Sequence, residues 1–234
     1  GAGPNGVAAA IPFLKEKNKY ELNMICSGEN LFTPEIVKLQ NYLKSLDKDS
    51  QHQYWENKEY ISKELIPKKL FFGESKVYKD IEEDLKISEK IKFDISHSVG
   101  GLSNVWGANV TGLSKNDIEN YHYEDNLSDQ LNKITTIFPI SGLKDDLDSD
   151  TPYNLNYNKI PLKYGFQAQT LINLYNENKK YFKKNNFRFG YAKLAIRTSD
   201  EIIDNNCKNS GLEMFGCNQN SIFNSTFFIN KYRK

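Results

Sequence analysis

The stretch "GAGPNGVAAAIPFLKEK", residues 1–17, places three glycines directly ahead of an apolar run. The apolar run predicts a helix, and its alanines suit close packing of that helix against a sheet. A Gly-x-Gly-x-x-Gly turn at a helix N-terminus is typical of dinucleotide-binding proteins, because it allows a tight turn and presents backbone N–H groups to a pyrophosphate. The turn therefore predicts five cofactor-binding residues: Gly1, Gly3, Pro4, Asn5 and Gly6.

A strand is predicted to follow this helix. The segment "YELNMICSG", residues 20–28, alternates and then becomes apolar, which is typical of a buried strand. In dinucleotide-binding units an acidic residue about 20 positions beyond the last glycine binds a ribose hydroxyl. Position 26 is Cys26 here, and Glu29, three residues later, becomes the candidate for that contact. Cys26 itself is interpreted as a small buried residue.

A second glycine-rich stretch, "SHSVGGLSNVWGANV" (residues 96–110), interrupts a chain that is otherwise rich in Lys, Asn and Asp. A glycine pair lets the backbone approach a flat or charged group that a Cβ would keep away. His97 is interpreted as a loop or positioning histidine rather than a catalytic base. The stretch gathers Gly100, Gly101, Ser103, Asn104, Trp106 and Gly107 within eight positions, which indicates a backbone surface open to such a group.

The composition excludes several classes of protein. Lys and Arg number 31 against 30 Asp and Glu, which argues against nucleic-acid binding by phosphate neutralisation. No apolar run is long enough to predict a membrane span, and no secretory signal is recognised. Three cysteines, an odd and sparse set, favour a reducing compartment and a cytoplasmic location.

Local signals predict several further elements. Thr33 and Pro34 are typical of an N-cap and first helical position, Ser114 is a candidate cap, and residues 164–182 have a helical pattern. Residues 65–73 and 187–199 are predicted as strands, and the charge-rich residues 78–93 as a solvated face.

No metal site is predicted. The acidic residues Asp146, Asp148 and Asp150 alternate as in a calcium loop, but such a loop needs Gly at its sixth position and Glu at its twelfth. Those positions are Thr151 and Tyr157. Cys207 and Cys217 have no second pair and no nearby histidine, whereas a zinc site needs four ligands.

Four motifs in order, the glycine turn, "GGLSNVWGA", "FPISG" and "C…G…GC…SI.NS", resemble the glucose–methanol–choline (GMC) oxidoreductases. The closest likeness is to a bacterial branch associated with sugar and polysaccharide metabolism. The motifs span essentially the whole chain, which would correspond to the N-terminal half of such an enzyme. The resemblance implies an α/β fold: a Rossmann-like FAD-binding domain with an interleaved, incomplete substrate domain. Residues 1–30 would form the dinucleotide-binding turn, helix and strand, residues 31–140 a helical insert with the second flavin contact, and residues 141–234 the start of the substrate domain and return segments.

The resemblance also implies the flavin contacts. By position these would be Gly100, Gly101, Ser103 and Asn104, with Trp106 and Gly107 close behind.

The resemblance further implies an activity. Members of the family bind FAD and oxidise an alcohol, with hydride transfer to flavin N5, so a small alcohol, sugar or polyol is the expected partner. Their catalytic histidine, paired with histidine or asparagine, lies near the C-terminus of the full enzyme. Both ends of this chain suggest a fragment, so the catalytic residues are not assigned and the chain alone is expected to be inactive. The segment "GLEMFGC", residues 211–217, departs from relatives richer in cysteine or proline.

Two alternatives remain open. The chain could be another dinucleotide-fold flavoprotein or a nicotinamide-dependent dehydrogenase, although a simple nicotinamide domain has no use for the second glycine-rich contact. The displaced acidic residue and Pro12, which lies inside the predicted helix, instead favour a non-catalytic binding module that keeps the fold.

Overall fold

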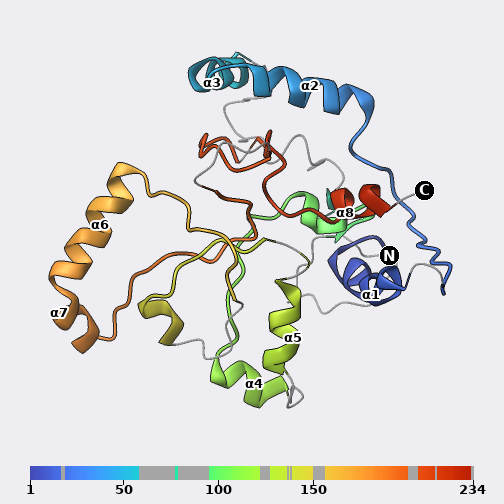
Figure 1. Ribbon diagram of the computed structural model, residues 1–234. Coiled ribbons are helices and arrows are strands. Elements are labelled where there is room, and N and C mark those ends of the chain that lie inside the picture. Colours follow the sequence, from blue (N-terminus) through green and yellow to red (C-terminus); the bar gives the residue numbers. More distant parts are fainter. Residues whose placement is uncertain are drawn as a thin grey trace. The chain divides into compact units, whose positions relative to one another are not determined.

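The computed structural model describes most of the chain (Figure 1), namely residues 1–16, 19–57, 77–78, 95–121, 127–135, 137, 139–149, 156–199, 205–213 and 215–232. It divides into two compact units: Gly1–Gly107 together with Ser210–Lys234, and Ala108–Asn209. The division expected at residues 30 and 140 stays a prediction. The predicted strand at residues 65–73 and residues 79–93 of the charge-rich stretch lie outside the described residues.

The described residues of the first unit form mainly helices. The 3-10 helix η3 (Gly101–Asn104) lies within the second glycine-rich stretch. Helix α8 (Ser225–Tyr232) contacts both η3 and α1 (Pro4–Lys15). A short antiparallel pair, β1 and β2, aligns Val77 with Ser96 and Tyr78 with Ile95. The elements of this unit are α1 (Pro4–Lys15), α2 (Pro34–Ser45), α3 (Lys48–Glu56), β1 (Val77–Tyr78), β2 (Ile95–Ser96), η3 (Gly101–Asn104) and α8 (Ser225–Tyr232).

The second unit also consists of helices joined by irregular segments. Isolated bridges link Leu194 to Asn109 and Ser141, and Ser141 to Lys159. Its helices are α4 (Lys115–Tyr121), α5 (Leu127–Ile134), η4 (Asp146–Ser149), α6 (Phe166–Glu177) and α7 (Lys179–Lys184). Helix α7 follows α6 directly, and the predicted helix at residues 164–182 is confirmed with an interruption at Asn178.

The helix starts predicted at Thr33 and Ser114 are confirmed, because both side chains make capping hydrogen bonds. The Thr33 hydroxyl accepts the Ile36 N–H at 3.4 Å, with Pro34 at the first position of α2. At α4, Ser114 Oγ accepts the Asp117 N–H at 3.1 Å while Asp117 Oδ2 accepts the Ser114 N–H at 2.9 Å. This reciprocal pair is a capping box, so both helices begin where the sequence predicts.

The core of the first unit lies between α2, α3 and the chain's C-terminal segment. Leu43, Trp55 and Leu212 are its buried members. The Trp55 ring stacks on Phe215 with centroids 4.9 Å apart. Residues from opposite ends of the sequence therefore share one apolar cluster, and the helices of this unit are stabilised by that burial rather than by propensity alone.

The predicted strands at residues 20–28 and 187–199 are wrong. The structure assigns no strand to either segment, and the Ile25 side chain is 85% exposed, so the first is not buried. A strand exists only through hydrogen bonds to a neighbouring strand. Among the described residues β structure consists of the β1–β2 pair and isolated bridges, so the α/β, Rossmann-like fold stays a prediction.

No helix among the described residues is both long and apolar enough to cross a bilayer.

Candidate functional site

The glycine turn leads into α1, which confirms the predicted helix. Gly3 precedes the helix in an extended conformation and Pro4 takes its first position, where the missing N–H leaves no bond unmade. A Cβ on Gly6 would lie 1.7 Å from the Gly1 carbonyl oxygen, so only glycine fits there. The first turn of α1 carries neither a capping side chain nor an acidic residue, which leaves its partial positive charge uncompensated. The helix continues through Pro12 to Lys15.

The structure brings the two glycine-rich stretches together. The Gly100 N–H donates to the Ala2 carbonyl oxygen at 3.1 Å. A Cβ on Gly101 would lie 3.5 Å from Gly3 Cα, so the glycine leaves little more than the width of one carbon between the two backbones. Two motifs far apart in the sequence therefore lie side by side.

A third predicted segment lies against the same loop. The Val99 N–H donates to the Glu29 carbonyl oxygen at 2.9 Å. The Cys26 thiol donates to the His97 carbonyl oxygen at 3.5 Å, and a Cβ on Gly28 would lie 1.7 Å from that same oxygen. The backbone around Glu29 therefore runs close beside the loop that leads to Gly100. Cys26, expected to be buried, is partly exposed.

The side chains of Ser103 and Asn104 are both 4% exposed and bound within the chain. Ser103 Oγ donates to the Gly100 carbonyl oxygen at 2.6 Å and accepts the Ser225 N–H at 3.0 Å. Asn104 Oδ1 lies 3.0 Å from the Thr226 hydroxyl. Both side chains hold the glycine loop in shape, so any contribution to cofactor binding comes through the backbone that they position.

Five of the other predicted contacts border open space. A Cβ built on Gly1, Gly3 or Gly107 would have no atom within 4 Å, and the adjoining Pro4 and Asn5 are exposed. The Trp106 indole donates to the Phe223 carbonyl oxygen at 2.8 Å and meets the Phe223 ring edge-on. Trp106 thus ties the second glycine stretch to the C-terminal segment.

Sequence reasoning missed the residues that hold this arrangement from the C-terminal side. Asn224, Ser225 and Thr226 are buried at the start of α8. The motif "SI.NS" contained the first two without indicating a role for them. Thr226 carried no sequence signal, because the partner of a threonine hydroxyl is set by which loop folds against it.

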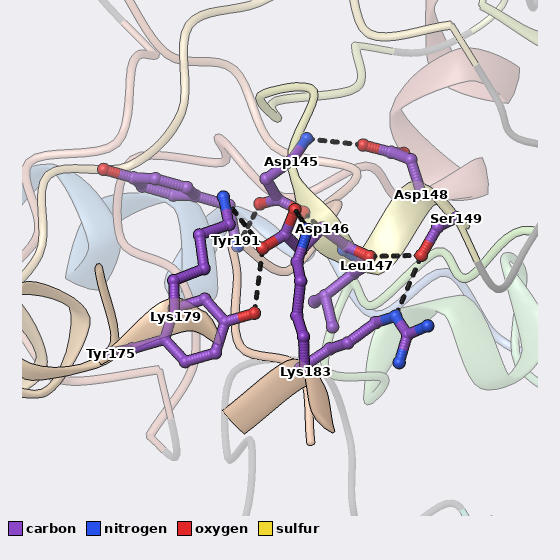
Figure 2. A network of polar contacts seen from close by, with 10 residues as sticks. Asp145, Asp146, Leu147, Asp148, Ser149, Tyr175, Lys179, Lys183 and Tyr191 are labelled. Carbon is purple, nitrogen blue, oxygen red and sulfur yellow. Dashed lines mark hydrogen bonds and ion pairs between the residues drawn. The ribbon is translucent and has the colours of Figure 1, made fainter. Parts of the chain in front are cut away.

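The acidic stretch of the second unit forms a network of ion pairs (Figure 2). Asp146 pairs with Lys179 Nζ at 2.9 Å and Lys183 Nζ at 3.0 Å, and accepts the Tyr175 hydroxyl at 2.8 Å. Lys179 above all, then Lys183 and Tyr175, hold the pKa of the Asp146 carboxyl well below its ordinary value. Two lysines therefore neutralise this carboxylate. Asp150 lies outside the described residues.

The neighbouring aspartates are bound in the same way. Lys193 Nζ lies 3.1 Å from Asp148 Oδ1 and 3.6 Å from Asp145 Oδ1. Asp145 also accepts the Tyr191 N–H at 2.6 Å. Burial raises the pKa of Tyr164, which stacks on Tyr191 at 4.1 Å, to about 12. The network fastens η4 to the chain around residue 191, and we interpret it as structural.

Replacing Asp146 tests this interpretation. Because the folded-state pKa of Asp146 lies below the ordinary value of 3.8, its stabilisation is present above pH 3.8 and is lost as the pH falls below that value. We expect Asp146→Asn to lower the free energy of unfolding by about 1–2 kcal/mol at pH 7, since its lysine partners are half exposed. The pH dependence below pH 4 should also become shallower than in the wild type.

Urea unfolding at pH 7, 4 and 3, followed by circular dichroism, measures both effects. Glu177→Gln, which removes an exposed carboxylate at the end of α6 in the same unit, is the control and should lower neither quantity. Equal stability of wild type and Asp146→Asn at pH 7 would contradict the structural role.

Comparison of the chain with protein-family models, curated proteins and solved structures found no match. Among the described residues no group of three or more His, Cys, Asp and Glu side chains is placed to hold a metal ion.

Proposed function

We propose that this chain binds FAD where the glycine turn of α1 meets the Gly100–Gly101 loop. We further propose that it is the cofactor-binding part of a GMC-type oxidoreductase. Such an enzyme oxidises an alcohol, a sugar or polyol being the expected class. The proposal assigns cofactor binding to this chain and assigns no general base.

One observation carries the proposal: the hydrogen bond of 3.1 Å from the Gly100 N–H to the Ala2 carbonyl oxygen. It joins two glycine-rich stretches that the sequence singled out independently. A contact between them is expected if both serve one extended ligand, because a dinucleotide spans the phosphate-binding turn and a second backbone surface. A nicotinamide domain would not require the second stretch.

The residues around this contact fit a dinucleotide. The N-terminus of α1 offers backbone N–H groups and partial positive charge for a pyrophosphate. The open space at Gly1, Gly3 and Gly107 is where a ligand would approach the backbone closely, as glycine permits. Glu29 is the candidate for a ribose hydroxyl, since its backbone lies against the same loop.

Bound FAD would supply the hydride acceptor, and the chain's own residues would bind and orient it. Ser103 and Asn104 would keep the glycine loop in its conformation through their hydrogen bonds to its backbone. His97 lies in that loop with its backbone carbonyl close to Gly28. We assign His97 to this loop and not to proton transfer.

The proposal is tested by replacing Gly3, which borders the open space. We expect the full chain to bind FAD, with quenching of flavin fluorescence and a shifted visible absorption band. A valine at position 3 would occupy the space that the pyrophosphate needs, so Gly3→Val should raise the Kd for FAD about tenfold or more. Isothermal titration calorimetry gives an independent Kd for FAD.

Gly165→Val is the matched control. Gly165 also precedes a helix, α6, in an extended conformation, and a Cβ there would likewise have no atom within 4 Å. Both variants should therefore lose similar stability, while only Gly3→Val weakens FAD. Binding of NAD instead of FAD would favour the dehydrogenase alternative, and binding of neither would overturn the proposal.

A further inference from the structure

The start of α8 is buried against the glycine loop, although no cofactor contact was predicted there. Asn224, Ser225 and Thr226 are 3%, 0% and 0% exposed. Asn224 Oδ1 accepts the Thr226 N–H at 2.8 Å, which caps the helix. The capped start of α8 therefore lies directly against the glycine loop.

The Thr226 hydroxyl meets a single peptide unit of that loop. It donates to the Val99 carbonyl oxygen at 2.6 Å, and Asn104 Nδ2 donates to the same oxygen at 2.9 Å. The N–H of this peptide unit belongs to Gly100 and donates to the Ala2 carbonyl oxygen. Both polar groups of this peptide are therefore bound. The carbonyl is held by side chains of α8 and η3, and the N–H by the glycine turn that precedes α1.

The same hydroxyl explains why residue 100 is glycine. Gly100 has φ +96°, a conformation that residues with a side chain rarely adopt. A Cβ there would lie 2.1 Å from Thr226 Oγ1 and 2.7 Å from Asn104 Oδ1. The hydroxyl fills the space that a side chain would need, so Gly100 and Thr226 depend on each other.

We propose that Thr226 is a positioning residue for cofactor binding, which acts through the Val99–Gly100 peptide. This inference rests on the proposed function, because the ligand of the positioned loop is taken to be FAD. Without the hydroxyl, the Val99 carbonyl keeps only the Asn104 donor, so the peptide plane is held less firmly. The backbone around Gly3 and Gly101 is then positioned less precisely for a ligand.

The test compares three variants of the full chain by titration with FAD and by thermal unfolding. Thr226→Val replaces the hydroxyl with a methyl group of similar size and should raise the Kd for FAD about tenfold. Thr226→Ser keeps the hydroxyl and should restore wild-type affinity. Thr198→Val is the control, since Thr198 is 7% exposed and donates to the Ile160 carbonyl oxygen within the other unit.

A positioning role predicts that Thr226→Val and Thr198→Val lose similar thermal stability while only the first weakens FAD. The absorption band of bound flavin should shift in Thr226→Val and not in Thr198→Val. If Thr226→Val does not fold, Thr226→Cys, whose thiol is a weak donor, should show intermediate affinity.

Unchanged FAD affinity in folded Thr226→Val or Thr226→Cys, or equal weakening by Thr198→Val, would overturn this inference and leave the proposed function standing. Failure of the wild type to bind FAD would instead overturn the proposed function.

Discussion

Gly100→Ala is expected to destabilise the first unit by about 3–5 kcal/mol, because it combines backbone strain with a buried clash. At φ +96° an alanine is strained, and its Cβ would lie 2.1 Å from the Thr226 hydroxyl. The hydroxyl must then leave the Val99 carbonyl oxygen, and the loop loses its hold on α8. FAD binding should be lost together with this stability.

Gly211→Ala is the matched control for that result. Gly211 also has a left-handed backbone, with φ +77°, but a Cβ there would have no atom within 4 Å. Only strain remains, so a loss of about 1–2 kcal/mol is expected. Urea unfolding monitored by tryptophan fluorescence measures both changes, and equal losses would show that the contact between Gly100 and Thr226 does not form.

Leu43→Ala is expected to cost about 2–5 kcal/mol, the usual range for emptying a buried leucine site. The Leu43 side chain is 0% exposed and packs in the cluster with Trp55 and Leu212. Because Leu212 belongs to the C-terminal segment, the cavity should loosen that segment as well as α2. Urea unfolding and amide hydrogen exchange of residues 210–232 follow the two consequences.

Leu174→Ala, at a leucine of α6 that is 49% exposed, controls for helix propensity and should change the free energy of unfolding by less than about 0.5 kcal/mol. If Leu43→Ala were as mild, the packing of α2 against the C-terminal segment would be refuted.

Sequence reasoning predicted helix starts well and strands poorly. Thr33 and Ser114 cap their helices with atoms three residues away, so the information is contained in a short window. The strand predicted at residues 20–28 depends on a neighbour that local sequence cannot supply. Its alternating pattern is real, yet Ile25 is almost fully exposed.

In the candidate site, too, features set by local sequence were predicted and features set by distant residues were not. The glycine stretches were recognised because glycine at such spacing is unusual, and the structure places them in contact. The expected side-chain contacts were less predictable: Ser103 and Asn104 lie inward, bound to Gly100 and to the start of α8. Whether a polar side chain serves a ligand or its own loop depends on what packs behind it.

By itself, the sequence determined where glycine, proline and capping residues direct the backbone, because those effects act within one turn of chain. It thereby located the turn of α1, the starts of α2 and α4, and the loop around Gly100. Only the tertiary structure decided that Thr226 meets the Val99 carbonyl and that lysines of α7 neutralise Asp146. Both depend on contacts between residues far apart in the chain, which form only when the intervening segments fold around them.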